Sequence, residues 1–193
     1  MPFVFESTAI PNLVRIQPHL FEDDRGVYFK HYERDIYMEQ GITCSFTESS
    51  DLYTQKGALR GLHYQTEQSQ AKLIRVISGA VFDVAVDLRS ESATFGCYHT
   101  ELMRADEQKV LFIPEGFAHG FIALEEDTIF SYQCSGAYLP QASGGIRWDD
   151  PELSIPWPLG KYGIEHVIVT TKDMQWPTFA QYCRRNGITG NRG

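Results

Sequence analysis

The sequence predicts an all-β domain, a β-sandwich or jelly roll with a few short helices. Runs rich in β-branched and aromatic residues dominate the middle of the chain. Turns separate these runs at intervals of roughly ten residues, which is typical of antiparallel sandwiches and barrels. Helical signals are confined to two short segments, residues 33–40 and 176–185.

The central strands begin with two β-branched runs, residues 73–77 and 80–88, on either side of a Ser-Gly pair. Such a pattern predicts a β-hairpin. The second run alternates apolar residues with Asp83 and Asp87, so the carboxylates share one face of that strand. Further strands are expected at residues 98–103, 110–113, 120–124 and 129–133.

The chain shows no internal repeat and no low-complexity linker. Its 193 residues, 42% of them apolar, suit one domain with a sizeable core. We therefore expect a single domain over residues 1–180 and a polar, glycine-rich tail over residues 181–193.

The composition also limits which cellular location and which binding partners can be expected for this protein. The longest apolar run is far shorter than the roughly 20 residues of a membrane helix, and the N-terminus has no secretory pattern. A net charge of -8 argues against non-specific nucleic-acid binding. The 4 cysteines are widely spaced without a CxxC pair, as in proteins with free thiols. We expect a cytoplasmic protein that binds neither membrane nor nucleic acid.

Two short motifs carry the candidate chemistry. RGLHYQ (residues 60–65) is followed by Lys72, and PEGFAHG (residues 114–120) contributes a second histidine, His119. An arginine, a lysine and two histidines on strand-like runs can hold an anion and move a proton. In a regular strand Arg60 and His63 point to opposite faces. Gly61 could mark a bulge that re-aims one of them; otherwise Arg60 serves a neighbouring site or subunit.

A metal site is the competing interpretation of these histidines. Small jelly rolls of the cupin type often bind a metal through an HxH pair, a following glutamate and a later histidine. Here Gln65 replaces the second histidine, and Lys72 stands where a carboxylate would be sought. Only two imidazoles would remain, with a repelling cation nearby, so we expect no metal.

Without a metal, His63 is a candidate base that removes a proton from carbon next to a carbonyl. Lys72 would supply positive charge where an enolate oxygen develops. Tyr132 could donate a proton from the opposite face, which would invert the carbon. Each of these residues alone also fits a structural role, so the inference depends on the joint pattern.

Longer motifs identify a family. LRGLHYQ, GAVFDVAVDLR, TFG, IPEGFAHGF and IRWDDPELSIPWP resemble the dTDP-4-dehydrorhamnose 3,5-epimerase family, and the match runs from about residue 3 to residue 177. The resemblance implies a cupin-type jelly roll and a homodimer without cofactor. It also implies that the substrate is a nucleotide-linked 4-keto-6-deoxyhexose, as in deoxysugar biosynthesis.

The resemblance assigns roles to individual residues. It makes His63 the base, Asp173 the carboxylate that orients it, Lys72 the enolate-stabilising cation and Tyr132 the general acid. The implied substrate contacts are Arg25 and Arg60 at the diphosphate, Tyr138 stacked on the nucleotide base, and His119 and Lys172.

Three features depart from the family pattern at the nucleotide end: Lys30 replaces a glutamate, Glu48-Ser49-Ser50 replaces a Gln-Asp-Asn stretch, and a further glutamate is replaced near Ser143. Thymine presents an N3–H donor that suits a carboxylate, whereas cytosine presents an acceptor that suits an ammonium group. The substrate is therefore predicted to carry dTDP or CDP. A 3-epimerase, a ketoisomerase on the same scaffold and a non-catalytic sugar-nucleotide-binding protein remain alternatives.

Overall fold

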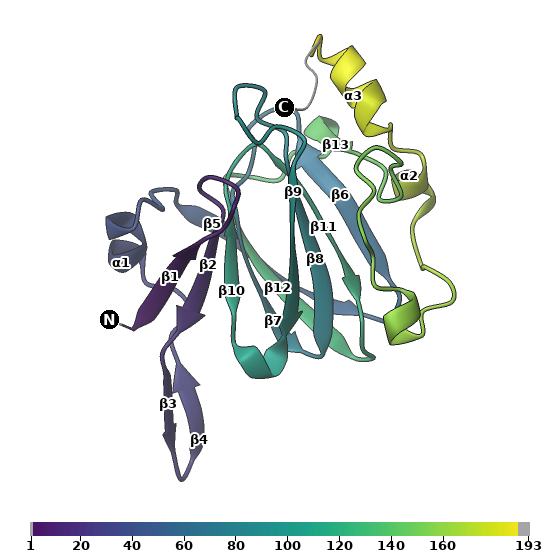
Figure 1. Ribbon diagram of the computed structural model, residues 1–193. Coiled ribbons are helices and arrows are strands. Elements are labelled where there is room, and N and C mark those ends of the chain that lie inside the picture. Colours follow the sequence, from purple (N-terminus) through teal and green to yellow (C-terminus); the bar gives the residue numbers. More distant parts are fainter. Residues whose placement is uncertain (1, 189–193) are drawn as a thin grey trace.

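The computed structural model describes residues 2–188, which form two antiparallel sheets facing each other (Figure 1). The six-stranded sheet has the order β1 (Phe3–Ser7), β2 (Val14–Pro18), β10 (Val110–Ile113), β7 (Lys72–Ser78), β12 (Thr128–Ser135), β5 (Phe46–Thr54). The five-stranded sheet has the order β13 (Ser143–Gly145), β6 (Leu59–Gln65), β11 (Phe117–Ala123), β8 (Ala80–Asp87), β9 (Tyr98–Arg104). The predicted all-β sandwich is confirmed.

The predicted hairpin between residues 73–77 and 80–88 is wrong, although both strands exist. β7 pairs with β10 and β12, whereas β8 pairs with β9 and β11 in the other sheet. The chain crosses between the sheets at Gly79, where φ is +75° and a Cβ would lie 2.4 Å from Thr128 Oγ1. Ile74 on β7 and Val81 on β8 then belong to one buried cluster between the sheets. Burying both strands in this core decides against pairing them with each other.

Both predicted helices are present. α1 spans Arg34–Glu39, and α3 spans Phe179–Arg185 after a capping box in which Thr178 and Gln181 bond each other's backbone N–H groups. Because this cap starts a helix, residues 181–185 of the predicted tail are helical, and residues 189–193 lie outside the described part. A further helix, α2 (Thr171–Met174), lies near the end of β6. No helix within residues 2–188 is long and apolar enough to cross a membrane.

The five-stranded sheet is covered on its outer face. Val84 and Val86 of β8 pack there against Ile146, Leu153 and Phe179 of the C-terminal part of the chain. This cover brings α2 close to β6, at the edge of the sheet formed by β13 and β6 (Figure 1).

A two-stranded hairpin, β3 (Leu20–Asp23) and β4 (Gly26–Phe29), projects away from the sandwich (Figure 1). Its large apolar side chains are exposed, and Tyr28 has 63% of its surface accessible. An isolated hairpin of this size is marginally stable in water.

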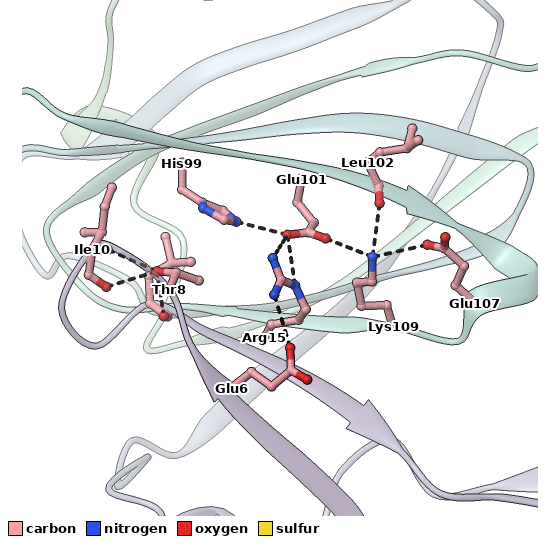
Figure 2. A network of polar contacts seen from close by, with 10 residues as sticks. Glu6, Thr8, Ile10, Arg15, His99, Glu101, Leu102, Glu107 and Lys109 are labelled. Carbon is pink, nitrogen blue, oxygen red and sulfur yellow. Dashed lines mark hydrogen bonds and ion pairs between the residues drawn. The ribbon is translucent and has the colours of Figure 1, made fainter.

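An ion-pair network joins Glu101, on the β9 edge of one sheet, to Arg15 of β2 in the other sheet and to Lys109, the residue before β10 (Figure 2). Glu101 on β9 accepts from Arg15 Nη2 at 2.7 Å and from His99 Nε2 at 3.0 Å through Oε2, and from Lys109 Nζ at 2.8 Å through Oε1. Burial opposes ionisation of Glu101, but these bonds outweigh it and lower its pKa to about 2. The network therefore depends on an ionised Glu101.

Candidate active site

A cavity of about 360 Å³ lies between the two sheets. Most of the residues predicted as functional lie in its wall: Glu48, Arg60, His63, Lys72, His119, Tyr132, Tyr138, Lys172 and Asp173. Apolar side chains such as Phe121 and Phe130 form its floor with them. A largely apolar cleft with a few convergent polar groups is the usual form of a small-molecule site.

Arg60 and His63 both reach this cavity because β6 is irregular at Gly61. The pairing of β6 with β11 shifts register between His119 and Phe121. Gly61 has φ +139°, and a Cβ there would lie 2.5 Å from Gly120 Cα. The irregularity predicted at Gly61 is confirmed, and it turns two side chains three residues apart toward one site.

His63 forms a dyad with Asp173. Its Nε2 lies 2.7 Å from Asp173 Oδ1, and Trp176 Nε1 donates to the same oxygen at 3.1 Å. Thr170 caps α2 by accepting from the Asp173 N–H, which fixes the helix that carries the carboxylate. Burial opposes ionisation of Asp173, but the hydrogen bonds from His63 and Trp176 outweigh it and lower its pKa. An ionised Asp173 orients the His63 ring through this bond.

Lys72 and Tyr132 face the cavity from the six-stranded sheet. Lys72 Nζ lies 3.6 Å from Cys134 Sγ and 5.9 Å from the centre of the Tyr132 ring. Within residues 2–188, no carboxylate forms an ion pair with Lys72, so its charge is available to a ligand. Burial raises the pKa of the Tyr132 phenol and Cys134 adds to the rise, while a hydrogen bond with Ser50 opposes it. Tyr132 is therefore protonated at neutral pH and able to donate.

The second histidine has its own carboxylate. His119 pairs with His63 across β11 and β6, and its Nε2 lies 2.7 Å from Asp83 Oδ2. Asp83 is fully buried on β8, which raises its pKa, and its other oxygen has no partner among the described residues.

The remaining predicted contacts lie where the cavity opens. Tyr138 is 53% exposed, and its backbone N–H donates to Glu48 Oε1 at 3.0 Å. Lys172 Nζ donates to Ser143 Oγ at 3.2 Å and lies over the Trp176 ring. Within residues 2–188, no three His, Cys, Asp or Glu side chains come close enough together to hold a metal ion.

Residues 7–181 match the family model of dTDP-4-dehydrorhamnose 3,5-epimerase. The chain belongs to this family. A relative from Methanothermobacter thermautotrophicus, dTDP-4-dehydrorhamnose 3,5-epimerase, is 40% identical over 90% of this chain and 93% of its own.

Solved structures of the family agree with the fold. A dTDP-6-deoxy-D-glucose-3,5-epimerase from Legionella pneumophila, in complex with dTDP-4-keto-L-rhamnose, has a TM-score of 0.87 and 39% identity over 91% of this chain and 92% of that one. ChmJ, a 3'-monoepimerase from Streptomyces bikiniensis in complex with dTDP-quinovose, has a TM-score of 0.85 and 28% identity over 95% and 91% of the two chains. The fold is the cupin-type jelly roll predicted from the sequence.

Arg25 and Lys30, expected from the family pattern to contact the nucleotide, do not reach the cavity of this chain. Arg25 sits at the tip of the projecting hairpin, where its side chain is 90% exposed and pairs with Asp23 at 2.6 Å. Lys30 follows the hairpin and pairs with Glu33 at 2.6 Å. Both side chains form ion pairs within their own segment, outside the cavity of this chain, and their contact with the nucleotide stays a prediction.

Sequence reasoning missed three residues that support the site: Asp83, Cys134 and Trp176. A carboxylate inside the apolar run of β8 was a usable signal for Asp83, because a buried charge requires a partner. Cys134 and Trp176 gave no such signal, since both also fit an ordinary core.

Proposed function

We propose that this protein is a cofactor-independent epimerase. It inverts C3, C5 or both in a 4-keto-6-deoxyhexose that is linked to a nucleoside diphosphate. One observation carries this proposal. His63 enters the cavity from the five-stranded sheet and Tyr132 from the six-stranded sheet, so a base and an acid lie on opposite walls.

The residues divide the proton transfer as follows. A C4 ketone acidifies the protons on C3 and C5, and His63, held by Asp173, removes one of them. The electron pair moves onto O4, where the unpaired ammonium of Lys72 stabilises the enolate. Tyr132 then donates its proton to the same carbon from the other face, and the configuration is inverted. His63 and Tyr132 return to their starting states through solvent.

The nucleotide is proposed to be dTDP. Two solved relatives hold dTDP-linked sugars. The alternative of CDP depends on Lys30, whose charge is balanced here by Glu33. A CDP preference therefore stays a prediction.

A homodimer is also part of the proposal. The projecting hairpin exposes Leu20, Phe21, Val27 and Tyr28, and a second copy of the chain would cover them. Arg25 at the hairpin tip would then reach the partner's cavity. The free thiols of the 4 cysteines support a cytoplasmic location, which also stays a prediction.

The first test is NMR of the protein in D2O with dTDP- and CDP-4-keto-6-deoxyglucose. Deuterium at both C3 and C5 would support 3,5-epimerisation, and deuterium at C3 alone would support a 3-epimerase. A 3-keto product would indicate a ketoisomerase instead. Absence of exchange with both substrates would refute the epimerase proposal and leave a binding protein. His63→Ala is the matched control and should abolish exchange; chelator should have no effect.

Mixing two inactive variants tests the dimer. In a mixed dimer of Arg25→Ala and His63→Ala subunits, one site keeps His63 and receives Arg25 from its partner. Activity should return after mixing if Arg25 acts across the dimer. If Arg25 acts within its own subunit, both sites stay defective and the mixture stays inactive.

A further inference from the structure

The segment that carries Tyr138 has an unusual support. It links β12 to the short helix Pro140–Ala142 and has no regular secondary structure of its own from residue 136 to residue 139. Its backbone groups bond to side chains of the sandwich instead. Because irregular backbone has few bonds of its own, these side chains determine where Tyr138 lies.

Gln65 makes two of these contacts and a third bond to the backbone of Gln68. Its Oε1 accepts from the Leu139 N–H at 2.6 Å, and its Nε2 donates to the carbonyl oxygens of Ala137 at 3.3 Å and Gln68 at 2.9 Å. The amide orientation is unambiguous, since an N–H faces one end and two carbonyls face the other. Gln65 is 9% exposed, so water does not readily replace these bonds.

Other side chains each hold the same segment at a single residue. Glu48 accepts from the Tyr138 N–H, and Gly136 O accepts from Thr47 Oγ1 at 2.9 Å. Gln65 differs from both because it bonds on each side of Tyr138, at Ala137 and at Leu139. It therefore fixes the direction of the chain through Tyr138, and not only one end of the segment.

Gln65 also connects this segment to the base. It lies two residues after His63 on β6, so both side chains share one face of that strand and both line the cavity. A metal-binding cupin would use this position for a ligand, whereas here both ends of the amide bond to backbone.

We propose that Gln65 is a positioning residue that sets the location of Tyr138 relative to His63. This inference rests on the proposed function and on the role that the family resemblance gives Tyr138, stacking on the nucleotide base. Gln65 then contributes to nucleotide binding without touching the reacting carbons, and its loss should weaken binding and leave the proton transfer intact.

The test compares Gln65→Met, which keeps the length and removes all three bonds, with Gln65→Glu, which keeps the acceptor for Leu139. The matched control is Gln17→Met, because Gln17 also donates to a backbone carbonyl, that of Glu107, but lies on β2 outside the cavity. For Gln65→Met we expect a rise of about tenfold in KM and in the Kd of dTDP, with kcat within about twofold. Amide hydrogen exchange at Leu139 should accelerate. Gln65→Glu should retain protection at Leu139 and part of the affinity, and Gln17→Met should change neither.

Unchanged dTDP affinity in Gln65→Met, with faster exchange at Leu139, would overturn the inference. A fall in kcat at constant KM would overturn it equally, because it would place Gln65 in the chemistry. If Gln65→Met does not fold, the same comparison is made with Gln65→Glu, which must then weaken dTDP binding. Wild-type protein that binds dTDP but exchanges no deuterium would refute the proposed epimerase and leave the role of Gln65 standing.

Discussion

Glu101 provides a quantitative test of how the two sheets are held together. Its side chain is 8% exposed, and it joins Arg15 of β2 and Lys109 to β9 (Figure 2). The substitution Glu101→Gln keeps the shape and removes the charge. Because the pKa of Glu101 falls from 4.5 to about 2 in the folded protein, its ionised form favours folding.

The expected magnitude follows from that shift. At 1.36 kcal/mol per pKa unit, the full contribution of Glu101 at neutral pH is about 3 kcal/mol. A group whose folded pKa is depressed stabilises the fold above its unfolded pKa and loses this effect as the pH falls toward the folded value. Between pH 7 and pH 3 the loss from Glu101 alone should be about 2 kcal/mol.

Urea denaturation of both proteins at a series of pH values measures this loss. All other carboxylates titrate equally in the two proteins, so the difference in free energy of unfolding should shrink by about 2 kcal/mol between pH 7 and pH 3. Glu107→Gln is the control, since Glu107 is 41% exposed and pairs with the same Lys109 at 3.3 Å; its effect should stay below about 1 kcal/mol. If the free energies of unfolding of wild type and Glu101→Gln changed by the same amount between pH 7 and pH 3, the reasoning would be refuted.

Three further predictions concern the cavity. Asp173→Asn removes the charge that holds His63, so kcat should fall by about 10²-fold or more. Deuterium exchange into the substrate measures this fall. A decrease of less than about tenfold would contradict a catalytic role for the His63–Asp173 pair. Tyr132→Phe should retain deuterium exchange but lose inversion at one carbon or both, which NMR of the product measures. Complete loss of exchange would instead place Tyr132 in the first step, the removal of the proton. Gly61→Ala should lower the free energy of unfolding by at least about 2 kcal/mol, because its Cβ meets Gly120. Gly160→Ala, with open space around it, serves as its control in the same denaturation experiment.

The fold class was accessible from the sequence because strand patterns are local. The runs at residues 98–103 and 110–113 correspond closely to β9 and β10. Strand partners are not local, and the supposed hairpin at Gly79 shows the consequence. A small-residue turn between two apolar strands fits a hairpin and a crossing between sheets equally well. Only the rest of the core selects between them, since both strands are buried within it.

For the candidate site, too, the sequence identified residues but not their spatial arrangement. The sequence located His63, Lys72 and Tyr132 through the family pattern, and the structure brings them to one cavity. The family pattern did not indicate that Arg25 would lie at the end of a projecting hairpin, because such a pattern records which residues are present and not where they lie relative to the cavity. The role of Gln65 was missed for another reason: its partners are backbone groups, which leave no trace in residue identity.

The two carboxylate–histidine pairs explain why His63, and not its neighbour His119, is the proposed base. Asp173 has a lowered pKa and bonds from two donors, so it remains ionised, with its Oδ1 2.7 Å from His63 Nε2. Asp83 has a raised pKa because it is fully buried with one oxygen unpartnered, so ionisation of this carboxyl is opposed. Two titratable pairs in one site whose environments shift the carboxyl pKa values in opposite directions are suited to different tasks. His63 therefore lies beside an ionised carboxylate, the arrangement that orients an imidazole base, whereas the carboxyl beside His119 resists ionisation.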